Sequence, residues 1–523
     1  MKISNYQIGL FFGLYIAVFL LYNLNSEKQI INGGVGSDGF LYYTMARSSE
    51  QEFRDRKFES YWLGRMLLPR IAHYAEKAFS QVGLVDSTRD VKSMTQTHLF
   101  LNALWMTIIF LIIRKLGAHF GMNNVQILWT LIVCFLNFSF FRVFGYDPLF
   151  MDIFVSMLVI TAVYFHVIQA KTWMMLGIYF LILFSHPAAF LFVLPLILFL
   201  DLDKSDKYNY SLRSRLTIVY KFLMFAFILC FTLFWAYYVY TLFNQNRRPP
   251  FSHTEPVNFY LLPLSLVIYV GYLIFLHKKW SQLMLTAMAS FKFQKKIAIV
   301  FVCLLAMVLF RSIIIDSISS GSEKSILDLK GGKLWNLPAI LFFIPLVNPG
   351  ISFVAHFLYY GSFVLMILVF NKNFYKKISQ LNNSLILVTG LFFVFLLDSE
   401  SRRITFFIPL FSLLVIQSIS ISHKRQLFFT ALLLGLGIIF SGFWVYINEW
   451  SEGLTPNHYQ SQLWLNFHGP WMKTWFYGIG AALFLPCLWL FWYIKKRWTV
   501  PDRIDTAVVL PAGSDSRDGT SLL

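Results

Sequence analysis

Asp38 is the residue of this chain with the clearest capacity for acid–base chemistry. It lies in Gly-Ser-Asp-Gly-Phe-Leu-Tyr-Tyr, near the start of a hydrophilic stretch, 25–96, that separates two apolar segments. A carboxylate in this position is suited to act as a general base toward a hydroxyl group at a membrane surface. The alternative is structural: Asp38 is the N-cap of a helix over 39–49, because aspartate accepts hydrogen bonds from the free amides of a first turn.

Two arginines follow in the same stretch, within the segment 61–79. Its apolar residues recur at helical spacing, which predicts a helix that lies in the membrane interface and bends at Pro69. Arg65 and Arg70 on this helix either contact anionic lipid headgroups or hold the phosphate of a ligand with their planar fork of donors.

Further polar residues occur where apolar segments end. Asp147 precedes a proline and is typical of a turn that begins a helix. Asp152 lies about a turn deeper, where a carboxylate is costly and usually has a partner; Arg142 is the nearest candidate in the sequence. His186, in Ser-His-Pro, is either a structural group with satisfied hydrogen bonds or a ligand-binding residue at the membrane surface.

The densest group of charges, Leu-Leu-Asp-Ser-Glu-Ser-Arg-Arg, lies in a short connection between two apolar segments. Its charged residues, all candidates for the site, are Asp398, Glu400, Arg402 and Arg403. The group is either a solvated hairpin or a binding site for a monophosphate or diphosphate, because guanidinium groups match phosphate oxygens in geometry and charge.

Other chemistries lack support in the sequence. No Walker-type glycine loop, His-Glu-x-x-His motif, Gly-x-Ser-x-Gly elbow or acidic metal cluster stands out. The four cysteines all lie in apolar segments without a Cys-x-x-Cys spacing, so neither a disulfide framework nor a zinc site is indicated. We therefore expect no metal and no cofactor.

The composition indicates what must position these residues. Of the 523 residues, 57% are hydrophobic and 13% are charged, and the mean hydropathy is +0.60. A soluble domain has roughly a quarter of its residues charged, so we predict an all-α polytopic membrane protein. The net charge of +18 comes largely from short loops, where it marks the cytoplasmic side and gives no reason to expect a nucleic-acid partner.

Apolar segments predict about fourteen transmembrane helices with both termini in the cytoplasm. Two of them form a hairpin within 173–200 that turns at Ser185, His186 and Pro187. Proline breaks a helix, and this hairpin keeps the later basic loops on the same side as the earlier ones. The other predicted segments are 7–24, 97–113, 125–141, 149–169, 216–243, 259–276, 297–315, 351–370, 384–397, 404–420, 426–447 and 475–494.

This topology divides the chain into three parts. Residues 1–420 form a membrane region that contains the candidate site residues, with the long first loop, 25–96, and its interfacial helices on the outer side. Residues 421–497 add C-terminal transmembrane helices with an outer loop at 448–474, and the polar tail, 498–523, is predicted to be disordered and cytoplasmic. The short apolar run 335–347 is predicted to be re-entrant or interfacial.

This layout over 1–420 resembles the GT-C superfamily of polytopic glycosyltransferases. The shared features are an acid near the start of a long first outer loop, a bundle of spans, and a later acid-and-arginine hairpin before an apolar helix. The resemblance implies that Asp38 is the catalytic acid of the first loop and that Asp147 or Asp152 belongs to a second polar site. It also implies that Arg402 and Arg403 match the family's late motif, whereas a histidine at position 186 departs from the arginine or lysine that is common there.

The resemblance further implies an activity: inverting, metal-independent transfer of a sugar from a polyprenyl-phosphate carrier to a glycan, lipid or protein acceptor. The site would face the periplasm or exterior of a bacterial inner membrane, in contact with membrane lipids. Two alternatives remain open. A glycan polymerase or ligase should carry its large loop late in the chain, and a transporter or flippase of a lipid-linked sugar should place polar groups deep along its spans.

Overall fold

The computed structural model describes residues 2–26, 37–55, 63–86, 90–198, 213–222, 260–289, 295–318, 344–398, 400–445 and 472–499, with isolated residues between these ranges. The named elements within them are all helices, and one isolated bridge pairs Ile421 with Thr499. The all-α class predicted from the composition is therefore confirmed for the described chain. In order, the helices are α1 (Asn5–Asn25), α2 (Ser37–Arg47), α3 (Glu50–Arg54), α5 (Leu67–Gln81), α6 (Val91–His119), α7 (Asn124–Phe135), η2 (Phe138–Val143), α8 (Phe144–Tyr146), α9 (Asp152–Val167), α10 (Thr172–Ser185), α11 (Pro187–Leu198), α13 (Leu262–Phe275), η3 (Leu276–Ser281), α14 (Gln282–Ala289), α15 (Lys295–Ile318), α17 (Ile344–Val347), α18 (Ile351–Tyr360), α19 (Ser362–Val369), α20 (Asn371–Ile378), α21 (Asn383–Phe395), η4 (Ser401–Phe407), α22 (Ile408–Gln417), η5 (His423–Arg425), α23 (Gln426–Phe440) and α24 (Thr474–Trp498).

Six helices of the described chain are long and apolar enough to cross a membrane, or seven if one bent pair counts as a span. A helix needs about 20 residues to cross a hydrocarbon core of about 30 Å. Several other apolar helices are shorter than that, among them α9, α10, α18 and α21. Long apolar helices of this kind indicate a membrane-embedded protein. The six are α1, α6, α13 continued through η3 and α14, α15, η5 continued into α23, and α24.

The bent pair corrects one predicted segment. The apolar run 125–141 predicts one span, but α7 ends at Phe135, and the helix that continues through η2 and α8 is bent by 58° relative to α7. Asn137 causes the break, because its side chain donates to the Cys134 carbonyl at 2.7 Å and accepts from the Phe140 amide at 3.0 Å. An asparagine that bonds its own backbone in this way competes with the helical hydrogen bonds.

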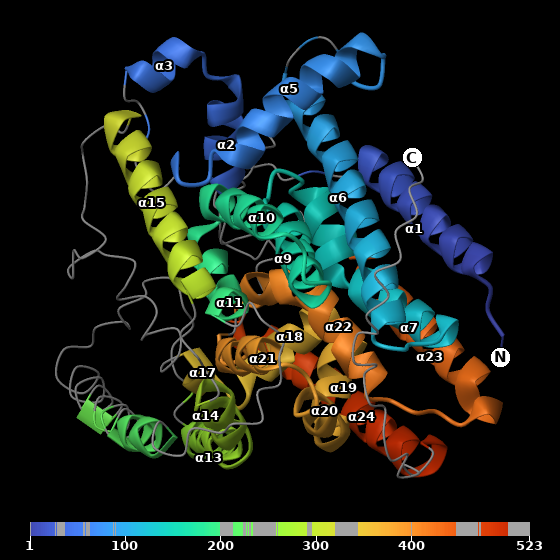
Figure 1. Ribbon diagram of the computed structural model, residues 1–523. Helices are drawn as coiled ribbons and strands as arrows, with labels where there is room; N and C mark the ends of the chain where they lie inside the picture. The colour runs from blue at the N-terminus through green and yellow to red at the C-terminus, as the bar shows by residue number, and fades with distance from the viewer. Residues whose placement is uncertain are drawn as a thin grey trace, which may run out of the picture.

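The interfacial helix of the first loop also differs from its prediction. The structure has α5 at Leu67–Gln81, and Pro69 lies in its first turn instead of at a bend. A proline in the first turn costs little, because an amide at that position has no partner within the helix. Figure 1 shows α2, α3 and α5 gathered at one end of the molecule, next to α6.

The predicted break in 173–200 is present. α10 ends at Ser185, α11 begins at Pro187, and His186 lies between them with an extended backbone. Both helices pack against α9 and against each other. The predicted interruption by proline therefore separates two short helices at this point.

Several hydrogen bonds join residues that the predicted topology assigns to the same side of the membrane. On the predicted outer side, Ser352 Oγ donates to the Leu397 carbonyl at 2.7 Å. On the predicted cytoplasmic side, Gln417 Nε2 donates to the Phe120 carbonyl at 2.9 Å. Further outer contacts join Asn258 to Val347 and Tyr477 to Pro349, and further cytoplasmic contacts join Asn124 to Ile3, Ser422 to Trp498 and Lys495 to Val369.

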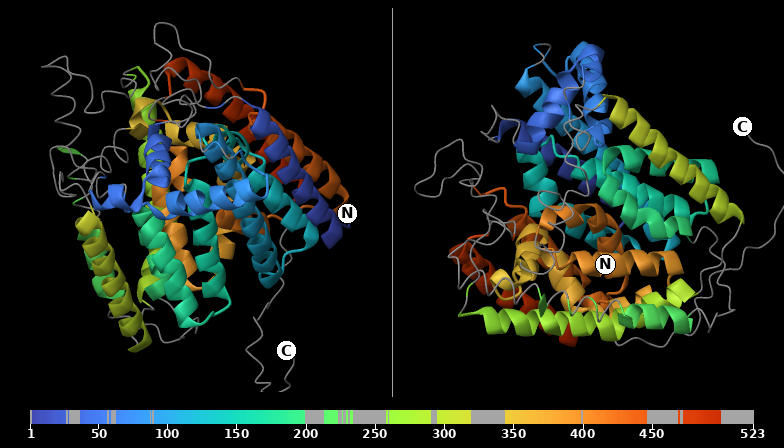
Figure 2. Two further views of the ribbon diagram at one scale, coloured as in Figure 1. Left: turned by 90° about the horizontal axis from the view of Figure 1, so that it is seen from above. Right: turned by 90° about the vertical axis from the view of Figure 1, so that its left-hand side faces the viewer.

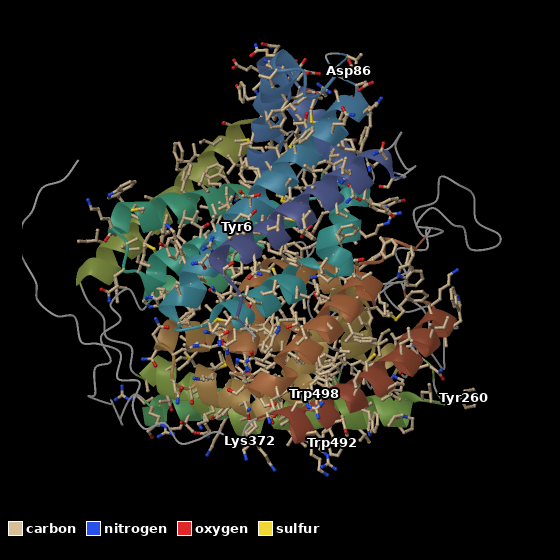
Figure 3. All side chains as sticks on the ribbon, turned by 90° about the vertical axis from the view of Figure 1, so that its right-hand side faces the viewer. Tyr6, Asp86, Tyr260, Lys372, Trp492 and Trp498 are labelled. Atoms are coloured by element: carbon tan, nitrogen blue, oxygen red, sulfur yellow. The ribbon has the colours of Figure 1, made fainter. Side chains whose placement is uncertain are left out.

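The first loop lies far from the C-terminal helices. Asp86, in this loop, lies at one extreme of the molecule, and Lys372 and Trp498 lie at the opposite one (Figure 3). The right-hand view of Figure 2 likewise places the blue helices of the first loop opposite α13 and α14. Several predictions fall outside the described residues: most of the segment 216–243, the run 335–343, the greater part of the loop 448–474, and the tail from residue 500.

Candidate functional site

The predicted site residues meet where η4 packs against the start of α9. Arg402 on η4 lies 3.9 Å, Nε to Oδ2, from Asp152, the first residue of α9. Its guanidinium also stacks 4.4 Å from the centre of the Phe150 ring. Arg142, the candidate partner of Asp152 that lies nearest in the sequence, has its guanidinium over the Tyr22 ring, and its Nη2 donates to the Val445 carbonyl at 3.4 Å. The carboxylate at the head of α9 therefore faces a cation that follows it by 250 residues in the sequence.

The second arginine of the motif is held tightly. Arg403 lies 2.9 Å from Asp398, Nη1 to Oδ2, and 2.7 Å from Glu400, Nη2 to Oε2. Both carboxylates are buried. Burial raises the pKa of Asp398 to about 6, and the adjacent Arg403 charge acts in the opposite direction. The contacts of Arg403 with Asp398 and Glu400 therefore all lie within the short connection between α21 and η4 and hold it in one conformation.

Hydrogen bonds with Asp398 and with α18 fix the backbone of this connection. Asp398 Oδ1 accepts a hydrogen bond from the Glu400 amide at 3.0 Å, which turns the chain into η4. Two residues of α18 then bond Ser401: Tyr360 Oη donates to its carbonyl at 2.6 Å, and His356 Nδ1 lies 2.9 Å from its Oγ. The turn therefore rests on a rigid helix, which limits how far the two arginines can move.

His186 joins the same cluster from the break between α10 and α11. Its ring centre lies 6.0 Å from that of Phe406 on η4. Burial and the charges of Arg65, Arg402 and Arg403 hold the pKa of His186 well below its usual range. The imidazole is therefore neutral, in an environment that contains three guanidinium groups.

Arg65 connects this cluster to the first loop. Its Nη1 donates to Tyr42 Oη at 3.2 Å, and Tyr42 is a buried residue of α2. The α2 helix begins at Ser37, so Asp38 lies inside its first turn and not at the N-cap position that we considered. The side chain of Asp38 lies outside what the structure describes, but its backbone is one helical turn before Tyr42.

Asp147 marks where the start of α2 lies. A Cβ atom added to Gly39 would be 3.3 Å from Asp147 Oδ1, so the first turn of α2 passes directly over this buried carboxylate. The close approach explains why a residue without a side chain occupies position 39. Asp38 and Asp147, which are separate in the sequence, are therefore neighbours through the backbone of α2.

Arg70 is the exception among the predicted binding residues. Its Nη1 donates to the Ser48 carbonyl at 3.1 Å, and its guanidinium lies over the rings of Phe53 and Tyr74. These contacts all lie within the first loop. Arg70 therefore stabilises that loop in the structure, whereas Arg65 reaches the cluster.

The structure thus joins seven predicted residues through direct contacts or mutual electrostatic effects and places an eighth under α2. The seven are Arg65, Asp152, His186, Asp398, Glu400, Arg402 and Arg403, and the eighth is Asp147. Sequence reasoning missed the aromatic residues that orient them, Phe150 under Arg402 and Phe406 beside His186. In a chain with 57 phenylalanines, no local signal distinguishes these two from packing residues.

The chemistry available at this cluster is recognition of an anion next to a carboxylate-bearing helix. Guanidinium groups and a neutral imidazole can donate several hydrogen bonds to phosphate oxygens, and a low-dielectric setting strengthens such contacts.

Comparison of the chain with protein-family models, with curated proteins and with solved structures finds no match, so no family is shown by similarity.

Proposed function

We propose that the protein is a membrane glycosyltransferase that transfers a sugar from a polyprenyl-phosphate carrier to a glycan, lipid or protein acceptor. In this proposal about fourteen spans embed the chain in a bacterial inner membrane, and the cluster faces the periplasm or exterior. One observation carries the proposal: cationic and neutral donors from the first loop, the α10–α11 break and η4 converge beside the helix that contains Asp38.

In the proposed reaction the acceptor hydroxyl attacks the anomeric carbon of the donor. The new C–O bond forms as the bond from that carbon to the phosphate oxygen breaks, and the phosphate leaves with the electron pair. Asp38 takes the proton of the attacking hydroxyl. Arg402 and Arg65 bind the phosphate, on which negative charge develops during the step.

Arg402 suits phosphate binding better than Arg403. The Arg402 guanidinium lies 3.9 Å from Asp152 and 3.8 Å from Glu400, at the long limit of an ion pair, and it is oriented by stacking on Phe150. Arg403 already makes two short contacts with carboxylates. We therefore assign ligand binding to Arg402 and support of the turn to Arg403.

The decisive experiment replaces Asp38 by asparagine in the cells that make the protein. General-base catalysis contributes roughly a hundred- to ten-thousand-fold in rate, so Asp38→Asn should behave as a loss of activity. The polyprenyl-phosphate sugar that is the donor should accumulate, as we also expect when the gene is deleted, and mass spectrometry of the lipid fraction would detect and name it.

Asp86→Asn is the matched control. Asp86 is an exposed acid of the same loop, at the far end of the molecule (Figure 3), and its replacement should leave the lipid-linked sugars unchanged. If Asp38→Asn protein reaches the membrane at normal levels and no lipid-linked sugar accumulates in these cells or in the deletion strain, the proposed function is wrong.

A further inference from the structure

The two ring nitrogens of His186 have different surroundings. Nδ1 accepts a hydrogen bond from the Ala189 backbone amide at 3.2 Å, so the ring acts as the N-cap of α11. Among the described residues, the hydrogen bond of the His186 ring is the one made by Nδ1, and the residue is half-buried. One nitrogen therefore has a structural role, and the other remains available to a ligand.

The cap also determines where the proton of the ring lies. A nitrogen that accepts a hydrogen bond carries no proton, and a neutral imidazole has one proton, so the proton of His186 is on Nε2. The charged groups around the ring favour this neutral form. Arg65 faces it from the first loop and Arg402 and Arg403 face it from η4, and together with burial they lower its pKa. The carboxylates of Asp152, Asp398 and Glu400 pair with Arg402 and Arg403.

We propose that His186 is a neutral donor whose Nε2–H donates a hydrogen bond to a phosphate oxygen of a ligand bound among Arg65, Arg402 and the start of α11. The inference rests on the proposed function for the identity of that ligand, the phosphodiester of a prenyl-linked sugar. A phosphodiester of a membrane lipid offers the same chemistry, and the experiment below separates the two sources.

The physical advantage of a neutral donor follows from the charges already present. A fourth cation beside three guanidinium groups would be repelled and would need further desolvation, whereas a neutral imidazole adds a directional donor without that cost. The start of α11 adds favourable partial positive charge, because the free amides of a helix N-terminus attract anions.

Two substitutions separate the cap from the donor. In His186→Asn the side-chain oxygen can replace Nδ1 as the cap, because asparagine is among the best N-cap residues, but nothing replaces the Nε2 donor. In His186→Gln the amide group can extend to the position of Nε2, but the cap is lost. We expect His186→Asn to keep the thermal stability of the wild type and to bind the ligand roughly tenfold to a hundredfold more weakly. We expect His186→Gln to be less stable and to bind more tightly than His186→Asn.

The probe is a prenyl methyl phosphodiester, whose single charge does not change between pH 5 and pH 8, and phosphatidylglycerol is the comparison ligand. Kd is measured for the purified full-length protein in detergent. If His186→Asn binds the probe as tightly as the wild type, the inference about His186 is overturned while the proposed function stands. If the wild type does not prefer the prenyl ligand to phosphatidylglycerol, the source is the membrane lipid and the proposed donor is wrong.

A pH series tests the neutral state itself. The ratio of Kd in His186→Asn to Kd in the wild type should be constant from pH 5 to pH 8, because the donor does not titrate in that range. Titration of other groups, such as Asp398, affects both proteins and cancels in the ratio. A ratio that falls as the pH rises through about 6.5, the ordinary pKa of histidine, would show that the imidazole donates as a cation and would overturn the proposal.

Discussion

Two ion clusters of this protein have similar components but different distances. In the brace, which we define as Arg47, Glu76 and Ser93, two Arg47 nitrogens reach the two Glu76 oxygens at 2.5 and 2.7 Å, and Ser93 Oγ donates to Glu76 at 2.5 Å. Arg47 also donates to the Asp90 carbonyl at 2.9 Å. The Glu76 side chain is 3% exposed. The brace therefore ties α2, α5 and α6 together through short contacts.

Two ion pairs of the site cluster are longer than those of the brace. Arg402 has contacts of 3.9 and 3.8 Å with Asp152 and Glu400, and 22% of its side chain is exposed. Beside it, the His186 ring makes its hydrogen bond within the described chain through Nδ1, which leaves Nε2 as a donor for a ligand. Short bidentate contacts make a cluster a structural connection, and long contacts with accessible donors leave room for a ligand. Distance and accessibility distinguish the two roles, while residue types alone do not.

The α2 helix contacts both clusters. Arg47, its last residue, belongs to the brace, and Tyr42 accepts a hydrogen bond from Arg65 of the site. Asp38 lies in the first turn of the same helix. Because α2 is a rigid helix, contacts that fix its last residue also fix the position of its first turn. We therefore expect the brace to position Asp38.

The largest effect on stability should follow removal of the buried member of the brace. Glu76→Ala leaves Arg47 without its carboxylate, and breaking a buried ion pair costs about 3–5 kcal/mol. We expect a clearly lower temperature of thermal unfolding in detergent and faster proteolysis of the first loop. Glu50→Ala, which changes an exposed acid of α3, is the control and should resemble the wild type. Equal stability of the two variants would remove the distinction between a structural and a binding cluster.

The next comparison is between the adjacent arginines of η4. Arg402→Lys loses the planar group that stacks on Phe150, and lysine is a poor substitute where a fork of donors is needed. We expect donor binding to weaken roughly tenfold to a hundredfold at nearly unchanged stability. Arg403→Lys should instead lower the free energy of unfolding by about 1 kcal/mol, a modest loss because 39% of the Arg403 side chain is exposed.

Measurement of Kd for the donor and of unfolding for both variants decides between the two assignments. If Arg403→Lys weakens donor binding more than Arg402→Lys does, the roles are reversed. If neither variant changes donor binding, the phosphate is bound elsewhere, and Arg65 becomes the principal candidate.

The sequence predicted the helical class, the break at His186 and the grouping of Asp398 with Arg403. These features depend on local information: composition, a proline, and charges within one short connection. The sequence also selected Asp152 and Arg65 as polar residues at segment ends. It could not show that they approach the same cluster, because their meeting depends on how α5, α9 and α10 pack.

Two further features were not predicted, one for a local reason and one because it depends on packing. The break at Asn137 depends on a side chain that bonds its own backbone, which competes with the helix in a way that apolar patterning does not reveal. From the sequence, Arg65 and Arg70 have the same two possible roles, contact with lipid headgroups or with a phosphate, and the sequence could not show that Arg70 contacts Phe53, Tyr74 and the Ser48 carbonyl within the first loop.

The smallest expected effect is a pH dependence of the folding stability that comes from Asp398, the buried acid of the site cluster. Burial raises the pKa of Asp398 to about 6, above its unfolded value of about 3.9. Between these values the native state keeps a proton that the unfolded state has lost, so stability falls as the pH rises from about 4 to about 6 and is level above that. The total change is roughly 2–3 kcal/mol. Asp398→Asn should remove this component, which thermal unfolding at pH 4.5 and pH 7.5 would measure as a smaller difference than in the wild type. If the difference is instead unchanged in Asp398→Asn, another acid titrates in this range, and the short contacts of Arg403 keep Asp398 ionised throughout.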